Sequence, residues 1–179
     1  MCGLRDVARR VLRWMLAPLR RRRAMRDGMV DATGRVSLPN DQLLPIVADA
    51  LAQGHTATIW VRGYSMRPFL EHERDRVRLA YPQRVEVGDA VLAQVARGHY
   101  VLHRVLSREG NLLTLQGDGN LRGVERCCMD DVCGVVIEYL RPGRAILASD
   151  PGLCRRIRLW RMLRPVRRPL LLLYRATLP

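Results

Sequence analysis

The chain contains a serine and a histidine whose surroundings suit nucleophilic catalysis. Ser65 lies in "RGYSMRPF", between a glycine turn and a Met-x-Pro segment, directly after the strand-like run "TATIWV". A serine nucleophile needs a base within hydrogen-bond reach, and usually a third group that orients this base. His103, in "YVLHRVL", is the only histidine that we expect inside a strand. The two residues could act as nucleophile and general base, although a serine in a turn is more often only a turn residue.

Lysine is absent from the sequence, so all 31 of its Lys and Arg residues are arginines. This excludes every mechanism that uses a lysine side chain, including Schiff-base chemistry, Ser-Lys dyads and Walker-type phosphate binding. Any general base must therefore be a histidine or a carboxylate. His103 satisfies this restriction.

The cysteines, at positions 2, 127, 128, 133 and 154, have a spacing that matches no zinc motif. We predict no metal site and no cofactor. Cys127 and Cys128 are interpreted as part of a turn, and Cys133 as a buried strand residue. An odd number of cysteines without a secretory signal favours reduced thiols and a cytoplasmic location.

Between the two ends of the chain, the sequence predicts a mainly antiparallel β domain with one leading helix. Residues 40–55 have helical apolar spacing, an N-terminal cap and a stop at Gly54. Short strand-like runs follow, and turn sequences such as "REGN" and "GDGN" separate them. The predicted strands are residues 56–61, 76–80, 90–95, 100–107, 112–116 and 132–139. These elements would position Ser65 after the first strand and His103 within the fourth.

The two ends of the chain carry the positive charge. Residues 1–35 hold ten arginines and three acidic residues (+7), and residues 151–179 hold eight arginines and no acidic residue (+8). We predict a basic amphipathic helical tail at 1–35, a folded domain at 36–148 and an Arg-rich helical tail at 149–179. Such ends suit anionic lipid headgroups or nucleic acid phosphates, and a purely solvated role is equally open. Neither end has the apolar run of a membrane span or a secretory signal.

Four motifs connect the candidate residues to a known family. They are "GYSMRPFL" at 63–70, "VGDAVLA" at 87–93, "YVLHRVL" at 100–106 and "LTLQGDGN" at 113–120. In this order they resemble the signature motifs of the signal peptidase I and LexA-like serine peptidase superfamily. The resemblance covers about residues 36–145 and implies the signal peptidase/LexA-like antiparallel β fold. It also implies that Ser65 is the nucleophile, and that Met66 and Pro68 shape its turn and contact the substrate.

The position of His103 resembles one subgroup of that superfamily. Bacterial signal peptidases and LexA-type proteins carry a catalytic lysine there, whereas the endoplasmic reticulum and archaeal signal peptidases carry a histidine in a similar "HRV" sequence. The resemblance implies that His103 is the general base. It further implies that Asp118, in "QGDGN", accepts the imidazole N–H and fixes its tautomer.

The chain departs from the pattern of this subgroup at three places. The histidine-type enzymes have a second aspartate where this chain has Val124, and the substitutes that we consider are Glu125, Asp130 and Asp131. The hydroxyl residue that precedes the nucleophile in many bacterial members is replaced by Gly63, so an oxyanion hole would rest on backbone N–H groups. The transmembrane helix that typically precedes the serine is not predicted.

We therefore expect a serine endopeptidase that binds an extended peptide along a sheet edge and cleaves it, or a leader, after small residues. Its partners would be a peptide or preprotein and, through the Arg-rich tails, an anionic membrane surface, with nucleic acid the less favoured choice. We expect a cytoplasmic protein, at most peripheral to the membrane. Two other hypotheses stay open: a peptidase-like domain that has lost catalysis and only binds peptides, and a lipid or nucleic acid binding protein that uses the tails.

Overall fold

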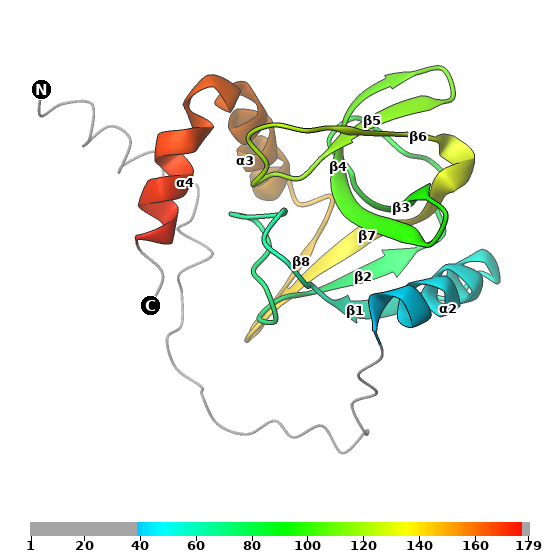
Figure 1. The fold of residues 1–179 in the computed structure, drawn as a ribbon. Coiled ribbons are helices and arrows are strands. Elements are labelled where there is room, and N and C mark those ends of the chain that lie inside the picture. Colours follow the sequence, from blue (N-terminus) through cyan, green and yellow to red (C-terminus); the bar gives the residue numbers. More distant parts are fainter. Residues whose placement is uncertain (1–38, 177–179) are drawn as a thin grey trace, which may run out of the picture.

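The computed structural model describes residues 39–176, which form an antiparallel β-sheet with helices before and after it (Figure 1). The prediction of a mainly β domain with one leading helix is confirmed. The elements in chain order are α2 (Asn40–Ala52), β1 (Ala57–Trp60), β2 (Arg76–Ala80), β3 (Ala90–Ala96), β4 (His99–Glu109), β5 (Leu112–Gln116), β6 (Glu125–Cys128), η1 (Met129–Asp131), β7 (Val132–Arg141), β8 (Arg144–Leu147), α3 (Pro151–Met162), η2 (Arg164–Val166) and α4 (Arg167–Arg175). The amphipathic helix predicted in residues 1–35 lies outside the described residues.

The eight strands form one sheet with the order β1-β2-β7-β3-β4-β5-β6, and β8 pairs with β7 beside this path. All strand pairs are antiparallel. The strands are rich in valine and leucine, which suit a pleated and buried surface. The long strand β4 pairs with β3 on one side and β5 on the other, and it carries His103. His103 itself is opposite Val91 of β3, and the pairing with β5 begins at the next residue, Arg104.

Buried apolar side chains form two clusters. The larger one includes the buried face of α2, where Leu44, Val47 and Leu51 have the i, i+3, i+7 spacing of an amphipathic helix. The smaller one lies among β3 to β6 and contains Val105 and Leu115 from adjacent strands. The sheet therefore has buried side chains on both of its faces in the region that holds the candidate site.

The segment predicted as an Arg-rich tail forms the helices α3 and α4, which pack against the domain (Figure 1). α3 begins after Asp150, whose carboxylate accepts a hydrogen bond from the Leu153 N–H at 2.7 Å. The apolar residues of both helices join the larger cluster, namely Leu153, Ile157, Trp160, Leu170, Leu171 and Tyr174. The helices thus share the core of the domain, although they follow the predicted boundary at residue 148. Within residues 39–176, no helix combines the length and the apolar character needed to cross a membrane.

The strands β6 and β8 are not among the predicted strands. Cys127 and Cys128 lie in β6, which pairs with β5, so the interpretation of these two residues as a turn is wrong. Cys127 is buried in the smaller cluster and Cys128 is exposed, as the alternation of side chains along a strand requires. Cys133 lies in β7, as predicted, but it is half-buried and not buried.

Candidate active site

Ser65 lies in the loop between β1 and β2, in a tight turn that is anchored on both sides. Gly63 before it has a φ of +91°, which favours glycine, and its N–H donates to Nδ1 of His72 at 3.0 Å. Met66 and Pro68 after it are buried, whereas Ser65 itself is only half-buried. Both predicted turn residues therefore hold the backbone of the serine against the core.

The loop that follows β5 packs directly onto this turn. The N–H of Gly119 donates to the carbonyl oxygen of Ser65 at 2.7 Å. A Cβ atom at Gly117 would lie 2.5 Å from that oxygen and 2.9 Å from Cβ of Ser65, and one at Gly119 would lie 2.8 Å from the carbonyl oxygen of Tyr64. A side chain cannot occupy such positions, so both glycines are needed for the close approach. The first and the last of the four motifs are therefore in contact.

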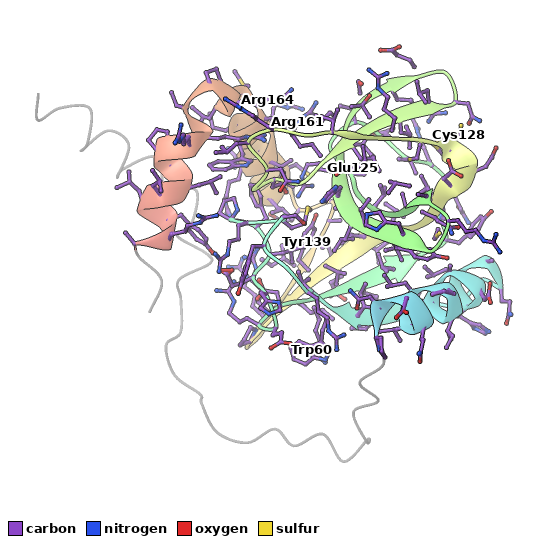
Figure 2. All side chains as sticks on the ribbon, in the orientation of Figure 1. Trp60, Glu125, Cys128, Tyr139, Arg161 and Arg164 are labelled. Atoms are coloured by element: carbon purple, nitrogen blue, oxygen red, sulfur yellow. The ribbon has the colours of Figure 1, made fainter. Side chains whose placement is uncertain are left out.

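His103 lies in β4 with 6% of its surface exposed. Its Nδ1 is 2.8 Å from Oε2 of Glu125, which is the first residue of β6 and is labelled in Figure 2. An ionised carboxylate has no proton to donate, so Nδ1 carries the hydrogen of this bond, and in the neutral imidazole Nε2 then has the lone pair. A neutral histidine held in this tautomer can act as a base through Nε2.

The ladder between β4 and β5 ends close to both candidate residues. Its last pair is Arg104 opposite Gln116, so His103 and Gly117 are the next residues of the two chain segments beyond that pair. Gly117 is also the residue whose Cβ would touch Ser65. The serine turn thus contacts the end of the ladder next to which His103 lies, although no hydrogen bond joins the side chains of Ser65 and His103 within the described part of the chain.

Asp118 has a partner other than His103. Nε of Arg104 donates to both carboxylate oxygens of Asp118 at 2.9 Å, and Nη2 donates to Oδ2 at 2.5 Å. Burial alone would lower the pKa of Arg104, but Asp118 and the Tyr139 hydroxyl raise it above its usual value, so the guanidinium stays charged. The predicted hydrogen bond from His103 to Asp118 is absent among residues 39–176, because adjacent residues of β4 point to opposite faces and Asp118 lies on the face of Arg104.

Arg104 is a central residue of the site that the motifs do not identify. Its Nη1 donates to the carbonyl oxygen of Gly88 at 2.8 Å, and its guanidinium lies 5.5 Å from the ring centroid of Phe69, which follows the serine turn. Arg104 therefore connects β4, the Gly88 turn, the Asp118 loop and the serine loop. The sequence signal for Arg104 is the "HRVL" run itself, in which a charged residue lies between His103 and two apolar residues in the middle of a predicted strand.

The helices α3 and α4 support both loops of the site. Nε1 of Trp160 donates to the carbonyl oxygen of Asp118 at 2.8 Å. The Tyr174 hydroxyl donates to Oε2 of Glu71 at 2.9 Å, and the other oxygen of Glu71 forms an ion pair with Arg67. Because Arg67 and Glu71 follow Ser65 in the same loop, the C-terminal helices position the nucleophile as well as the Asp118 loop.

Two backbone donors next to the nucleophile have no partner. The N–H groups of Ser65 and Met66 donate to no acceptor within residues 39–176, whereas the Gly63 N–H donates to Nδ1 of His72. Free backbone N–H groups at a nucleophile are the groups that stabilise an oxyanion in acyl transfer.

In the part of the chain that the structure describes, no group of three or more His, Cys, Asp or Glu side chains is placed to hold a metal ion. Comparison of the chain with protein-family models, curated proteins and solved structures found no match. The chemistry of the site is therefore inferred from its own residues, which are a half-buried serine, a histidine with a carboxylate on one ring nitrogen, and two free backbone donors.

Proposed function

We propose that the chain is a serine endopeptidase of the histidine type within the signal peptidase and LexA-like superfamily. Ser65 is the nucleophile, His103 is the general base and Glu125 orients the base. One observation carries this proposal: Gly117 brings the serine turn against the strand of His103, whose far ring nitrogen is bound to a carboxylate 2.8 Å away. Sequence order and spatial arrangement thus support the same pair of residues.

The proposed reaction begins when Nε2 of His103 takes the hydroxyl proton of Ser65 while Oγ attacks the carbonyl carbon of the substrate peptide bond. Glu125 accepts the Nδ1 hydrogen and stabilises the imidazolium that forms. The negative charge on the former carbonyl oxygen is stabilised by the N–H groups of Ser65 and Met66. The imidazolium then protonates the leaving amine, and water, deprotonated by His103, hydrolyses the acyl-enzyme.

Ser65 and His103 must move closer for this reaction, since their side chains share no hydrogen bond within residues 39–176. Catalytic hydrogen bonds are often long in the absence of substrate and tighten in the substrate complex. The loop that carries Ser65 already contacts Gly117, next to the end of the ladder between β4 and β5.

The proposed substrate is an extended peptide or leader with small residues next to the scissile bond, as the superfamily resemblance implies. Strand addition to a sheet edge would hold such a peptide through its backbone. Met66 and Pro68 would shape the substrate site through the turn that they anchor. The reaction needs no cofactor, and the proposed setting is the cytoplasm.

Cleavage of an Ala-x-Ala type peptide library, analysed by mass spectrometry, tests the proposal. Ser65→Ala and His103→Ala should each abolish the cleavage products of the native sequence. Matched controls are Ser107→Ala in the same strand as the base and His99→Ala, which is exposed at the tip of the β3–β4 hairpin. Full cleavage by the Ser65→Ala variant would exclude the assignment.

A catalytically inactive peptide-binding domain is the second candidate. The observation that favours it is the missing hydrogen bond between Ser65 and His103 among the described residues. A serine-directed fluorophosphonate probe separates the two candidates, because an active site labels at Ser65, whereas a binding domain stays unlabelled while retaining affinity for the peptide.

A further inference from the structure

The outer face of α3 combines arginines with an exposed apolar residue. Its inner face is buried through Leu153, Ile157 and Trp160. On the opposite face, Arg155, Arg158 and Met162 recur at i, i+3 and i+7, and all of them are exposed. Met162 is the most exposed large apolar residue of the described chain, with 71% of its surface in solvent.

The outer face of α4 repeats this composition. Arg168, Leu172 and Arg175 recur at i, i+4 and i+7 and are exposed, opposite the buried Leu170 and Tyr174. Leu172 is 58% exposed. The turn between the helices adds the exposed residues Arg164 and Val166, and Figure 2 shows Arg161 and Arg164 where α3 ends.

The positive charges of these helices have no acidic counterpart within them. Residues 151–179 contain no Asp or Glu, and no ion pair within residues 39–176 includes an arginine of α3 or α4. Arg161 is the exception in orientation, because its Nη2 donates to the carbonyl oxygen of Leu106 at 3.0 Å. The exposed arginines of the two outer faces are therefore available to an external anion.

We propose that the outer faces of α3 and α4 bind an anionic phospholipid surface. The arginines would contact the phosphates, and Met162 and Leu172 would insert at the boundary between headgroups and acyl chains. Charge alone would also suit nucleic acid, but the exposed apolar residues of these faces are aliphatic. The rings of Trp160 and Tyr174 are buried and cannot stack on bases.

Lipid binding at these helices would also place the candidate active site near the membrane. Trp160 holds the Asp118 loop and Tyr174 holds the serine loop through Glu71. The lipid-binding proposal does not depend on catalysis, since it rests on the outer faces of the helices alone.

Cosedimentation of the full chain with vesicles tests this proposal. We expect binding to vesicles of phosphatidylcholine mixed with phosphatidylglycerol, weakening as salt increases, and little binding to phosphatidylcholine alone. Substitution of four arginines by glutamine, at Arg155, Arg158, Arg168 and Arg175, should weaken binding more than about a hundredfold, since each arginine near such a surface contributes about fivefold. The control Arg84→Gln with Arg97→Gln removes exposed charges elsewhere and should change binding less than about threefold.

A second variant separates lipid from nucleic acid. Met162→Ser with Leu172→Ser keeps the charge and should weaken binding to the anionic vesicles about tenfold, because apolar insertion is lost. Binding to a short duplex DNA should be weaker than vesicle binding and unchanged by this variant. Vesicle binding that is insensitive to either set of substitutions, or tighter binding to DNA than to the vesicles, would overturn the proposal.

Discussion

Nδ1 of His103 in β4 and Oε2 of Glu125 in β6 lie 2.8 Å apart, although β5 pairs with both strands and lies between them. Val105 in β4 is opposite Leu115, and Leu115 is opposite Glu125. His103, two residues before Val105, points to the same face as this row, and on that face its ring reaches the carboxylate across β5. The orienting carboxylate thus comes from the strand after the "QGDGN" loop, not from the loop itself.

Glu125→Gln should reduce kcat for peptide cleavage about a hundredfold to ten-thousandfold, with KM little changed. Glutamine keeps the size of the side chain but can present its amide N–H₂ to Nδ1, which favours the tautomer that has its hydrogen on Nε2. Steady-state kinetics on the best library peptide provide the measurement. Glu125→Asp should recover part of the activity, and wild-type kcat in the glutamine variant would leave His103 without an orienting group.

Asp118→Asn should mainly reduce stability, by about 3 kcal/mol in the free energy of unfolding. The substitution leaves the Arg104 guanidinium buried with a neutral partner, since both side chains are nearly inaccessible to solvent. Urea denaturation measures the loss. Below the unfolding transition, this variant should keep a much larger share of kcat than Glu125→Gln, and the opposite ranking would make Asp118 the orienting residue.

The sequence predicts the strands β2 and β5 with the bounds that the structure has. It also predicts that Ser65 follows the first strand and that His103 lies within the fourth, as in the structure. It does not predict β6, because "ERCC" has only a short alternating pattern, and Glu125 therefore stays one of three possible carboxylates.

The C-terminal segment, predicted as an Arg-rich helical tail, is helical, but its packing against the domain was not predicted. Arginine density there is high enough to suggest a solvated segment, yet Leu153, Ile157 and Trp160 follow the i, i+4, i+7 spacing of a buried face. The apolar periodicity of this segment indicates its packing better than its charge does, because arginines on the outer face of a helix do not prevent the inner face from packing.

Gly117→Ala should disable the nucleophile while most of the fold stays intact. The added Cβ would lie 2.5 Å from the carbonyl oxygen of Ser65 and 2.9 Å from its Cβ, so the serine turn must shift. We expect a loss of labelling by the serine-directed probe. Gly123→Ala is the control for backbone strain, because its φ is +81° but no atom lies within 4 Å of the added Cβ. Equal labelling of the Gly117→Ala and Gly123→Ala variants would show that the close packing at Gly117 is not needed to position Ser65.

Trp160→Ala should lower the free energy of unfolding by about 3 to 5 kcal/mol, whereas Arg155→Ala in the same helix should change it by less than about 0.5 kcal/mol. Trp160 is fully buried and donates a hydrogen bond to the Asp118 carbonyl, while Arg155 is exposed. Trp160→Phe keeps most of the packing and removes only that hydrogen bond, so its cost should be about 1 to 2 kcal/mol. Thermal and urea denaturation of the three variants measure these differences. Equal stability of Trp160→Ala and Arg155→Ala would mean that α3 is not part of the cooperative core.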